Sequence, residues 1–163
     1  MKKYFSFWLV LVLVAVMAIL PFAAQADGGR DLHHSISVQN VIPPKSISDN
    51  TAIVGAIIDS VGYGAIEYVI HSGAISDNAS TYTPLLEDCD VSDCSDNAAV
   101  ADAYLLGTES AASFSGLEDD TIKLLGYIGN KRYTRLTLTP VTASGTGLMA
   151  VDVIRGYPKV RPQ

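Results

Sequence analysis

Short runs of β-branched and aromatic residues alternate with clusters of Gly, Pro, Asn, Asp and Ser along most of the chain. This pattern is typical of β-strands joined by turns, and no long segment has the three- and four-residue apolar spacing of an amphipathic helix. Only the alanine-rich segment Ala98–Leu106 offers a short helix as an alternative. The pattern predicts strands at Ser35–Val41, Thr51–Ile58, Ala65–His71, Thr81–Leu86, Thr121–Ile128, Lys131–Thr139 and Leu148–Ile154.

Three of the predicted strands alternate strictly between two faces. The expected inward sets are Ile66, Tyr68 and Ile70; Thr134, Leu136 and Leu138; and Met149, Val151 and Val153. Alternation with a period of two is the pattern of strands that bury one face and expose the other to water. A series of such strands predicts an all-β fold, an antiparallel two-sheet sandwich, of which the jelly roll is one form.

The N-terminus has the layout of a secretory signal peptide. Lys2 and Lys3 precede an uninterrupted apolar run, Phe7–Leu20, and Ala24-Gln25-Ala26 matches the small-residue cleavage pattern. The run is shorter than the roughly 18 residues of a membrane span, so we expect export to the periplasm or the extracellular space. No stable membrane span is expected after cleavage, and an uncleaved N-terminal anchor is the alternative.

These features predict a chain with one folded domain. Its length suits a single core large enough to fold without a cofactor. Prolines near the C-terminus favour an extended arm there. The predicted organisation is a signal peptide (1–26), a β-sandwich domain (27–155) and a C-terminal arm (156–163).

The charge of the chain is negative and unevenly distributed. The net charge is −6, and cleavage after Ala26 would remove two lysines and no acid, which gives −8. This balance argues against a general nucleic-acid-binding protein, which needs excess positive charge. Glu67–Asp120 contains twelve carboxylates and no Lys or Arg, whereas the chain from Thr121 onward has seven basic residues and a single acid, Asp152. The two parts are expected to pair, either within the fold or between subunits.

Gly129-Asn130 lies between two predicted strands and is the signal of a two-residue hairpin turn. Lys131 and Arg132 would directly follow that turn, and Arg135 would lie on the polar face of the returning strand. Charges in such positions keep a sheet hydrated, and this interpretation is favoured over a dedicated anion site.

Cys89 and Cys94 are the only cysteines in the chain. Export would place them in an oxidising compartment, so a disulfide between them is expected. Closing so short a loop stabilises a fold by about 2 kcal/mol on the chain-entropy model. The C-x-x-x-x-C spacing differs from the C-x-x-C of thioredoxin-like enzymes, which argues against redox catalysis.

The two cysteines lie in an acidic cluster, Glu87–Asn97. Asp88 and Asp90 resemble the first ligand positions of a calcium loop, but Asp93 stands where that loop needs a glycine. A solvated acidic loop is the favoured interpretation. A loose calcium site that uses Asp88, Asp90 and Asp93 is the alternative.

The sequence contains no recognisable catalytic motif. The histidines, His33, His34 and His71, lack the spacing of a metal site, and no G-x-S-x-G elbow marks a nucleophile. Asn78-Ala79-Ser80 fits the N-glycosylation pattern. We therefore predict a protein that is not an enzyme, with no catalytic residue and no cofactor.

Three stretches, Arg30–Asp77, Tyr82–Glu109 and Asp119–Pro140, resemble a family of small β-rich proteins encoded by tailed bacteriophages and prophages. Gly126–Leu138 and the segment "GAIIDS…EYVIHSG" are the most distinctive parts. The resemblance extends from Arg30 to about Val153 and implies a virion structural or head-decoration protein with no catalytic motif. Virion proteins assemble in the cytoplasm, so either the true start lies downstream or a phage-type domain has been recruited for export.

The leading hypothesis is a non-enzymatic structural protein that packs against itself, as a homo-oligomer, or against a capsid protein. Its interface is expected at or beside Lys131, Arg132, Tyr133 and Arg135. Two other classes stay open: an exported β-sandwich module that binds calcium or a carbohydrate, and an extracellular hydrolase with an unrecognised site.

Overall fold

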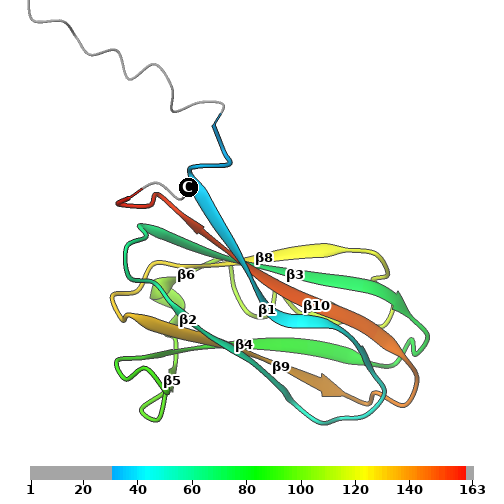
Figure 1. Cartoon of the computed structure of the whole chain (residues 1–163). Coiled ribbons are helices and arrows are strands. Elements are labelled where there is room, and N and C mark those ends of the chain that lie inside the picture. Colours follow the sequence, from blue (N-terminus) through cyan, green and yellow to red (C-terminus); the bar gives the residue numbers. More distant parts are fainter. Residues whose placement is uncertain (1–30, 161–163) are drawn as a thin grey trace, which may run out of the picture. The chain divides into compact units, whose positions relative to one another are not determined.

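The computed structural model describes residues 31–160, and this part of the chain is a β-sandwich (Figure 1). Each of the predicted strands is present, and the helix alternative at Ala98–Leu106 is reduced to one 3-10 turn, η1 (Asp102–Tyr104). The long strands are β1 (Ile36–Ile47), β2 (Ile53–Asp59), β3 (Ala65–Ile75), β4 (Thr81–Cys89), β8 (Ile122–Tyr127), β9 (Tyr133–Val141) and β10 (Gly147–Gly156). The short strands are β5 (Ala98–Ala99), β6 (Leu105–Leu106) and β7 (Phe114–Ser115).

The strands form two antiparallel sheets. Sheet A has the order β1-β10-β3-β8-β6, and sheet B has the order β2-β9-β4-β5, with β7 also paired to β4. Each long strand is followed along the chain by one in the other sheet, from β1 to β4 and again from β8 to β10. This interleaving of two sheets is the strand arrangement of a jelly roll, and the prediction of an antiparallel two-sheet sandwich is confirmed.

The predicted hairpin at Gly129-Asn130 is wrong. β8 pairs with β3 and β6, whereas β9 pairs with β2 and β4, so the two strands belong to different sheets. Strands in one sheet lie about 4.8 Å apart and packed sheets about 10 Å apart, so the longer connection 128–132 is needed to cross. Glycine at position 129 has a packing role, because a Cβ there would overlap the ring of Tyr127.

The alternation of inward and outward residues is confirmed in all three strands for which it was predicted. The inward sets of β3, β9 and β10 are buried, and together with residues from the other long strands they form one continuous core. Within this core the hydroxyls of Tyr68 on β3 and Thr134 on β9 share a 2.7 Å hydrogen bond that joins the two sheets. The bond satisfies two polar groups that are otherwise surrounded by apolar side chains.

The two ends of the described chain can be compared with the predicted signal peptide and C-terminal arm. The predicted signal peptide, residues 1–26, lies outside the described residues. At the other end, the N–H of Lys159 donates a 2.8 Å hydrogen bond to the carbonyl of Gly62, so residues 157–160 contact the β2–β3 turn. Within residues 31–160 no helix has the length and apolar character needed to cross a membrane.

Asp77 joins two turns, the one after β3 and the one before β10. Its Oδ2 accepts hydrogen bonds from the N–H and the hydroxyl of Ser144, at 2.9 and 2.8 Å, and its Oδ1 accepts one from the N–H of Ala79 at 3.0 Å. These bonds favour the charged carboxylate and lower the pKa of Asp77 from the usual 3.8 to about 2.

The low pKa of Asp77 predicts a pH-dependent contribution to stability. This contribution is complete above pH 3.8 and is lost as the pH falls towards about 2, because the folded-state pKa is below the unfolded one. We expect Asp77→Asn to lower Tm near neutral pH and to flatten the fall of Tm in that acidic range, as measured by circular dichroism. Asp102→Asn, at an exposed residue, is the control and should keep the wild-type profile. Identical profiles for wild type and Asp77→Asn would contradict the role of this carboxylate.

Candidate functional site

The outer face of sheet A is a grid of side chains set by the strand register. One row runs Val38, Ile154, Glu67, Gly126 and Leu106 across β1, β10, β3, β8 and β6. The next row runs Asn40, Asp152, Val69 and Leu124, and the one after it runs Ala150, His71 and Ile122. Residues in one row are direct cross-strand neighbours, so Val38 adjoins Ile154, and Val69 adjoins Leu124.

Much of this face is apolar and exposed to solvent. Five of its large apolar side chains are between 45% and 60% exposed: Val38, Leu106, Ile122, Leu124 and Leu148. Single exposed apolar residues are ordinary, whereas a continuous group of them marks an interaction surface. We call the outward residues of β1, β10, β3, β8 and β6 the sheet A face.

A short polar chain crosses the sheet A face. The amide of Asn40 donates a 2.9 Å hydrogen bond to Asp152 Oδ1, and Asp152 Oδ2 lies 3.5 Å from Nε2 of His71. The three residues come from β1, β10 and β3 and satisfy one another. They therefore link β1, β10 and β3 on their outer side and form a line of polar groups between the apolar ones.

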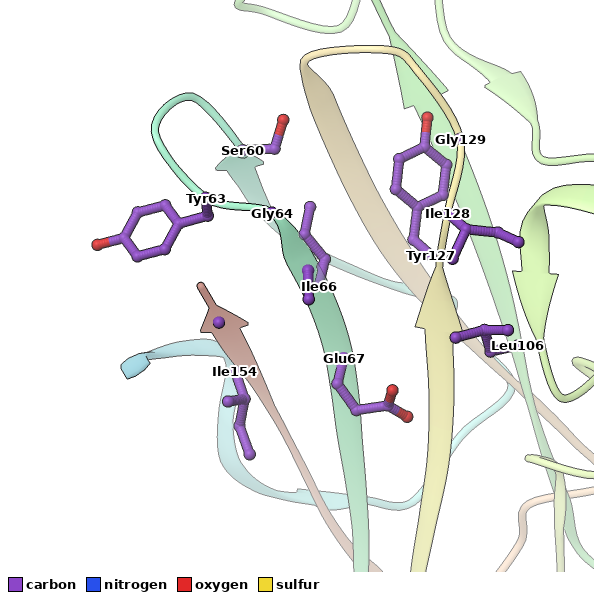
Figure 2. Close-up of a pocket in the computed structure, with 12 residues that line it drawn as sticks. Ser60, Tyr63, Gly64, Ile66, Glu67, Leu106, Tyr127, Ile128, Gly129 and Ile154 are labelled. Atoms are coloured by element: carbon purple, nitrogen blue, oxygen red, sulfur yellow. The ribbon is translucent and has the colours of Figure 1, made fainter. Parts of the chain in front are cut away.

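The face also contains a hollow with a volume of about 340 Å³, which lies where β3, β8 and β10 reach the same end of the sheet. Figure 2 shows Glu67 leaning from β3 towards β8, with Leu106 beyond it and Ile154 on the other side. Burial raises the pKa of Glu67 above its usual value of 4.5. No hydrogen bond or ion pair to Glu67 is formed within residues 31–160.

The basic residues that the sequence singled out lie just before β9 (Lys131 and Arg132) or on its outer face (Arg135), and each has an acidic partner. Arg132 donates two hydrogen bonds to Asp59, at 2.9 and 2.7 Å, which lowers the pKa of that carboxyl group. Arg135 donates two to Oε2 of Glu87, at 3.1 and 2.9 Å. The acidic and basic parts of the chain thus pair within the fold at Glu87 and Arg135, whereas Asp59 lies outside the acidic part.

Lys131 and Tyr133 complete the predicted interface set. Lys131 Nζ lies 3.4 Å from Oδ1 of Asp88 and 3.9 Å from Oδ2 of Asp90. The ring of Tyr133 lies under the guanidinium of Arg132, 4.9 Å from its centre. The four residues therefore lie close together at one end of β9, and their role in an interface stays a prediction.

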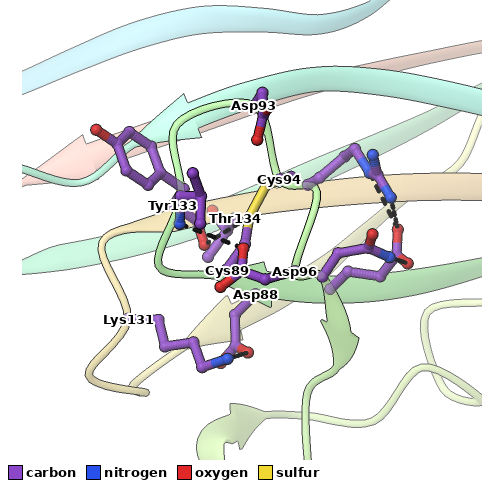
Figure 3. The surroundings of a disulfide bond; sticks show 12 residues. Asp88, Cys89, Asp93, Cys94, Asp96, Lys131, Tyr133 and Thr134 are labelled. Carbon is purple, nitrogen blue, oxygen red and sulfur yellow. Dashed lines mark hydrogen bonds and ion pairs between the residues drawn. A yellow bond between two sulfur atoms is a disulfide. The ribbon is translucent and has the colours of Figure 1, made fainter.

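The disulfide between Cys89 and Cys94 is confirmed (Figure 3). Cys89 ends β4, Cys94 lies in the loop that follows, and their Cα atoms are 5.2 Å apart. Both residues are buried, and the carboxylate of Asp96 accepts hydrogen bonds from the N–H groups of Asp90 and Val91, at 3.0 and 3.2 Å. The loop is thus closed by its own side chains.

Each of the three carboxylates of the calcium hypothesis has a partner within the chain, and Asp88 and Asp90 share Lys131. Asp88 is buried and accepts a 2.9 Å hydrogen bond from the hydroxyl of Tyr127, whose pKa is raised to about 12 by burial and by this carboxylate. Asp93 accepts a 3.0 Å bond from the N–H of Ser95, on the other side of the loop from Asp88 in Figure 3. Within residues 31–160 no group of three His, Cys, Asp or Glu is placed to hold a metal ion.

Removing the disulfide should have a measurable cost. We expect Cys89→Ala combined with Cys94→Ala to lower the free energy of unfolding by about 2 kcal/mol, because the unfolded chain is no longer constrained. Urea denaturation of the wild type and the double variant measures this difference. A reducing agent should destabilise the wild type by a similar amount and leave the variant unchanged. A double variant as stable as the wild type would contradict the expectation.

The histidines and serines do not assemble a hydrolase site at His71. His71 faces Asp152, and the hydroxyl of the adjacent Ser72 donates a 2.6 Å hydrogen bond to the carbonyl of Glu118 instead. The rings of His33 and His34 contact each other edge to face, with centres 5.0 Å apart. The prediction that this protein is not an enzyme stays a prediction.

Comparisons with known proteins give no relative from which a function can be transferred. No model of a protein family matches the chain, and no curated protein sequence matches it either.

Sequence reasoning missed the sheet A face and the Glu67 hollow. A signal was available in "TIKLLGY", where Ile122 and Leu124 alternate with Leu125 and Tyr127, so that both faces of β8 are largely apolar. Apolar residues on both faces of a strand indicate a second buried or contacting surface.

Proposed function

We propose that this chain is a non-enzymatic structural protein of the phage virion type, which acts through contacts with copies of itself or with a capsid protein. The observation that carries the proposal is the exposed apolar surface of the sheet A face, which extends over β1, β10, β8 and β6. Burying such a surface against a neighbour removes apolar area from water, and this supplies affinity.

The two outer faces of the sandwich differ in a way that supports this choice. The outward residues of β9 are Tyr133, Arg135, Thr137, Thr139 and Val141, and those of β4 are Thr81, Thr83, Leu85 and Glu87. This face of sheet B is mostly threonine and paired charge, which suits contact with water. The polar residues of the sheet A face are fewer, so it is the better contact surface.

The sheet A face could act as a contact surface in an exported protein or in a virion protein. The resemblance to phage and prophage proteins favours a virion, and the N-terminal pattern favours export. A jelly-roll sandwich with one apolar outer face serves protein–protein packing in either place.

Sedimentation velocity over a range of protein concentrations tests the proposal. We expect the wild type to self-associate and Ile122→Thr combined with Leu124→Thr to weaken that association, because both side chains are exposed on β8 and threonine preserves strand propensity. Val54→Thr combined with Leu85→Thr, at exposed positions of sheet B, is the matched control and should associate like the wild type. A monomer at every concentration would remove self-packing from the proposal.

A third variant separates this surface from the charged one. If Lys131, Arg132 and Arg135 form the interface, their joint reversal to Glu should weaken association, and less so at high salt. We expect the Ile122→Thr and Leu124→Thr variant of sheet A to weaken association more. The melting temperature must be compared in parallel, because the reversal also breaks ion pairs to Asp59 and Glu87.

A further inference from the structure

The carboxylate of Glu67 has an apolar environment on every side from which a neighbouring strand approaches. Its cross-strand neighbours are Ile154 on β10 and Gly126 on β8, and Leu106 is the partner of Gly126 on β6. Along β3 itself, Ala65 and Val69 are the adjacent residues on the same face. The charge therefore lies in a surface hollow whose walls are mainly apolar, with Ser60 and Tyr63 of the β2–β3 connection also lining it.

Gly126 makes room for this carboxylate. A Cβ at position 126 would lie 2.8 Å from Oε2 of Glu67 and 2.9 Å from the Cβ of Leu106. Any side chain there would have to displace Glu67 or Leu106, so the glycine opens the space that Glu67 occupies (Figure 2). The hollow is thus built from four strands, with the carboxylate inside it and solvent at its mouth.

No cation of the described chain neutralises Glu67. Arg155 is adjacent to Ile154 in sequence, but its guanidinium donates to the carbonyl of Asp59 and to the hydroxyl of Ser37, at 3.0 and 3.1 Å, and lies over the ring of Tyr63. The other charged groups outward on the neighbouring strands are Asp152 and His71, which face each other. A half-buried carboxylate without a cation costs free energy, and a cation from outside would recover part of it.

We propose that the Glu67 hollow binds an alkylammonium group, the end of a lysine side chain on the protein against which the sheet A face packs. Lysine has a compact charge on a flexible four-carbon stem, so the stem can lie along Leu106, Ile128 and Ile154 while the ammonium reaches the carboxylate. The protein nature of the partner rests on the proposed function, whereas the chemistry of the hollow does not.

NMR titration of the purified protein with n-butylammonium chloride tests the hollow directly. We expect saturable shifts of the methyl signals of Leu106, Ile128 and Ile154, and loss of these shifts in Glu67→Gln. Asp152→Asn removes a carboxylate that already has partners on the same face, and it should keep the binding. Butan-1-ol has the same stem without the charge and should give no saturable shifts.

Equal butylammonium shifts in wild type and Glu67→Gln would overturn the proposal, and so would equal shifts with butan-1-ol. Tighter binding of butylguanidinium would also overturn it, because the hollow would then prefer an arginine side chain to a lysine side chain. The titration uses dilute protein and does not depend on assembly. Loss of probe binding with normal sedimentation would therefore refute the lysine site alone. Normal probe binding by a protein that never self-associates would remove self-packing from the proposed function and leave the lysine site intact.

Discussion

Val151→Asp should prevent the protein from folding at 25 °C. Val151 lies on β10, in the interior of sheet A, and its side chain is fully buried in the core. An aspartate there would have to bury its charge without a partner or take up a proton. Either route costs several kcal/mol, a large part of the roughly 5–15 kcal/mol by which a domain is stable.

The same substitution on the other face of β10 is the control for this prediction. Leu148 points outward and is exposed, so Leu148→Asp should fold with a melting temperature close to that of the wild type. Circular dichroism and the near-ultraviolet signal of the tyrosines distinguish the two outcomes. A folded Val151→Asp, or an unfolded Leu148→Asp, would contradict the assignment of the two faces of β10.

Tyr68→Ala should lower the free energy of unfolding by about 3–5 kcal/mol, as expected when a buried aromatic side chain is removed. Tyr68 is fully buried on β3 and contributes both its ring and the hydroxyl that bonds to Thr134. Truncation leaves a cavity between the sheets and also leaves the Thr134 hydroxyl without its partner. Urea denaturation of each variant provides the measurement.

A series at the same pair separates packing from hydrogen bonding. Tyr68→Phe keeps the ring and leaves the buried Thr134 hydroxyl unpaired, which should cost about 1–3 kcal/mol. Thr134→Val alone should cost a similar amount, because it leaves the Tyr68 hydroxyl unpaired. The combined Tyr68→Phe and Thr134→Val variant should cost less than the sum of the two single changes. Additive costs would mean that the hydrogen bond does not couple the sheets.

Strand positions followed from local pattern because each strand must bury one face whatever it pairs with. Tyr68, Leu136 and Val151 were therefore placed in the core from alternation alone. The hairpin at Gly129-Asn130 failed because turn residues report local backbone preference, and they cannot reveal that consecutive strands belong to different sheets. The steric reason for Gly129, its contact with the ring of Tyr127, became visible only in three dimensions.

The candidate site was harder to predict for a related reason. The disulfide needed only two cysteines close in sequence and an oxidising compartment. The Glu67 hollow, in contrast, depends on the register of four strands, which places Ile154, Gly126 and Leu106 in one row although they are far apart in the chain. Local periodicity has no information about such pairings.

The sequence placed Arg135 on the correct face and left open whether the charges pair within the fold or between subunits. Alternation placed Arg135 on the outer face of β9, where the structure has it. Its partner Glu87 is directly opposite on β4, and this cross-strand pairing makes the ion pair internal to the chain. The two side chains are only 20% and 12% exposed, so removing one of them would leave the other charge largely buried without its partner.

Hydroxyl-radical footprinting of dilute and concentrated protein tests the central claim that the sheet A face is the contact surface. The account predicts that oxidation of Leu106, Leu124 and Leu148 falls as the protein associates, while oxidation of the exposed Val54 and Leu85 on sheet B is unchanged. Protection of Val54 and Leu85 instead, or association that protects neither face, would contradict it.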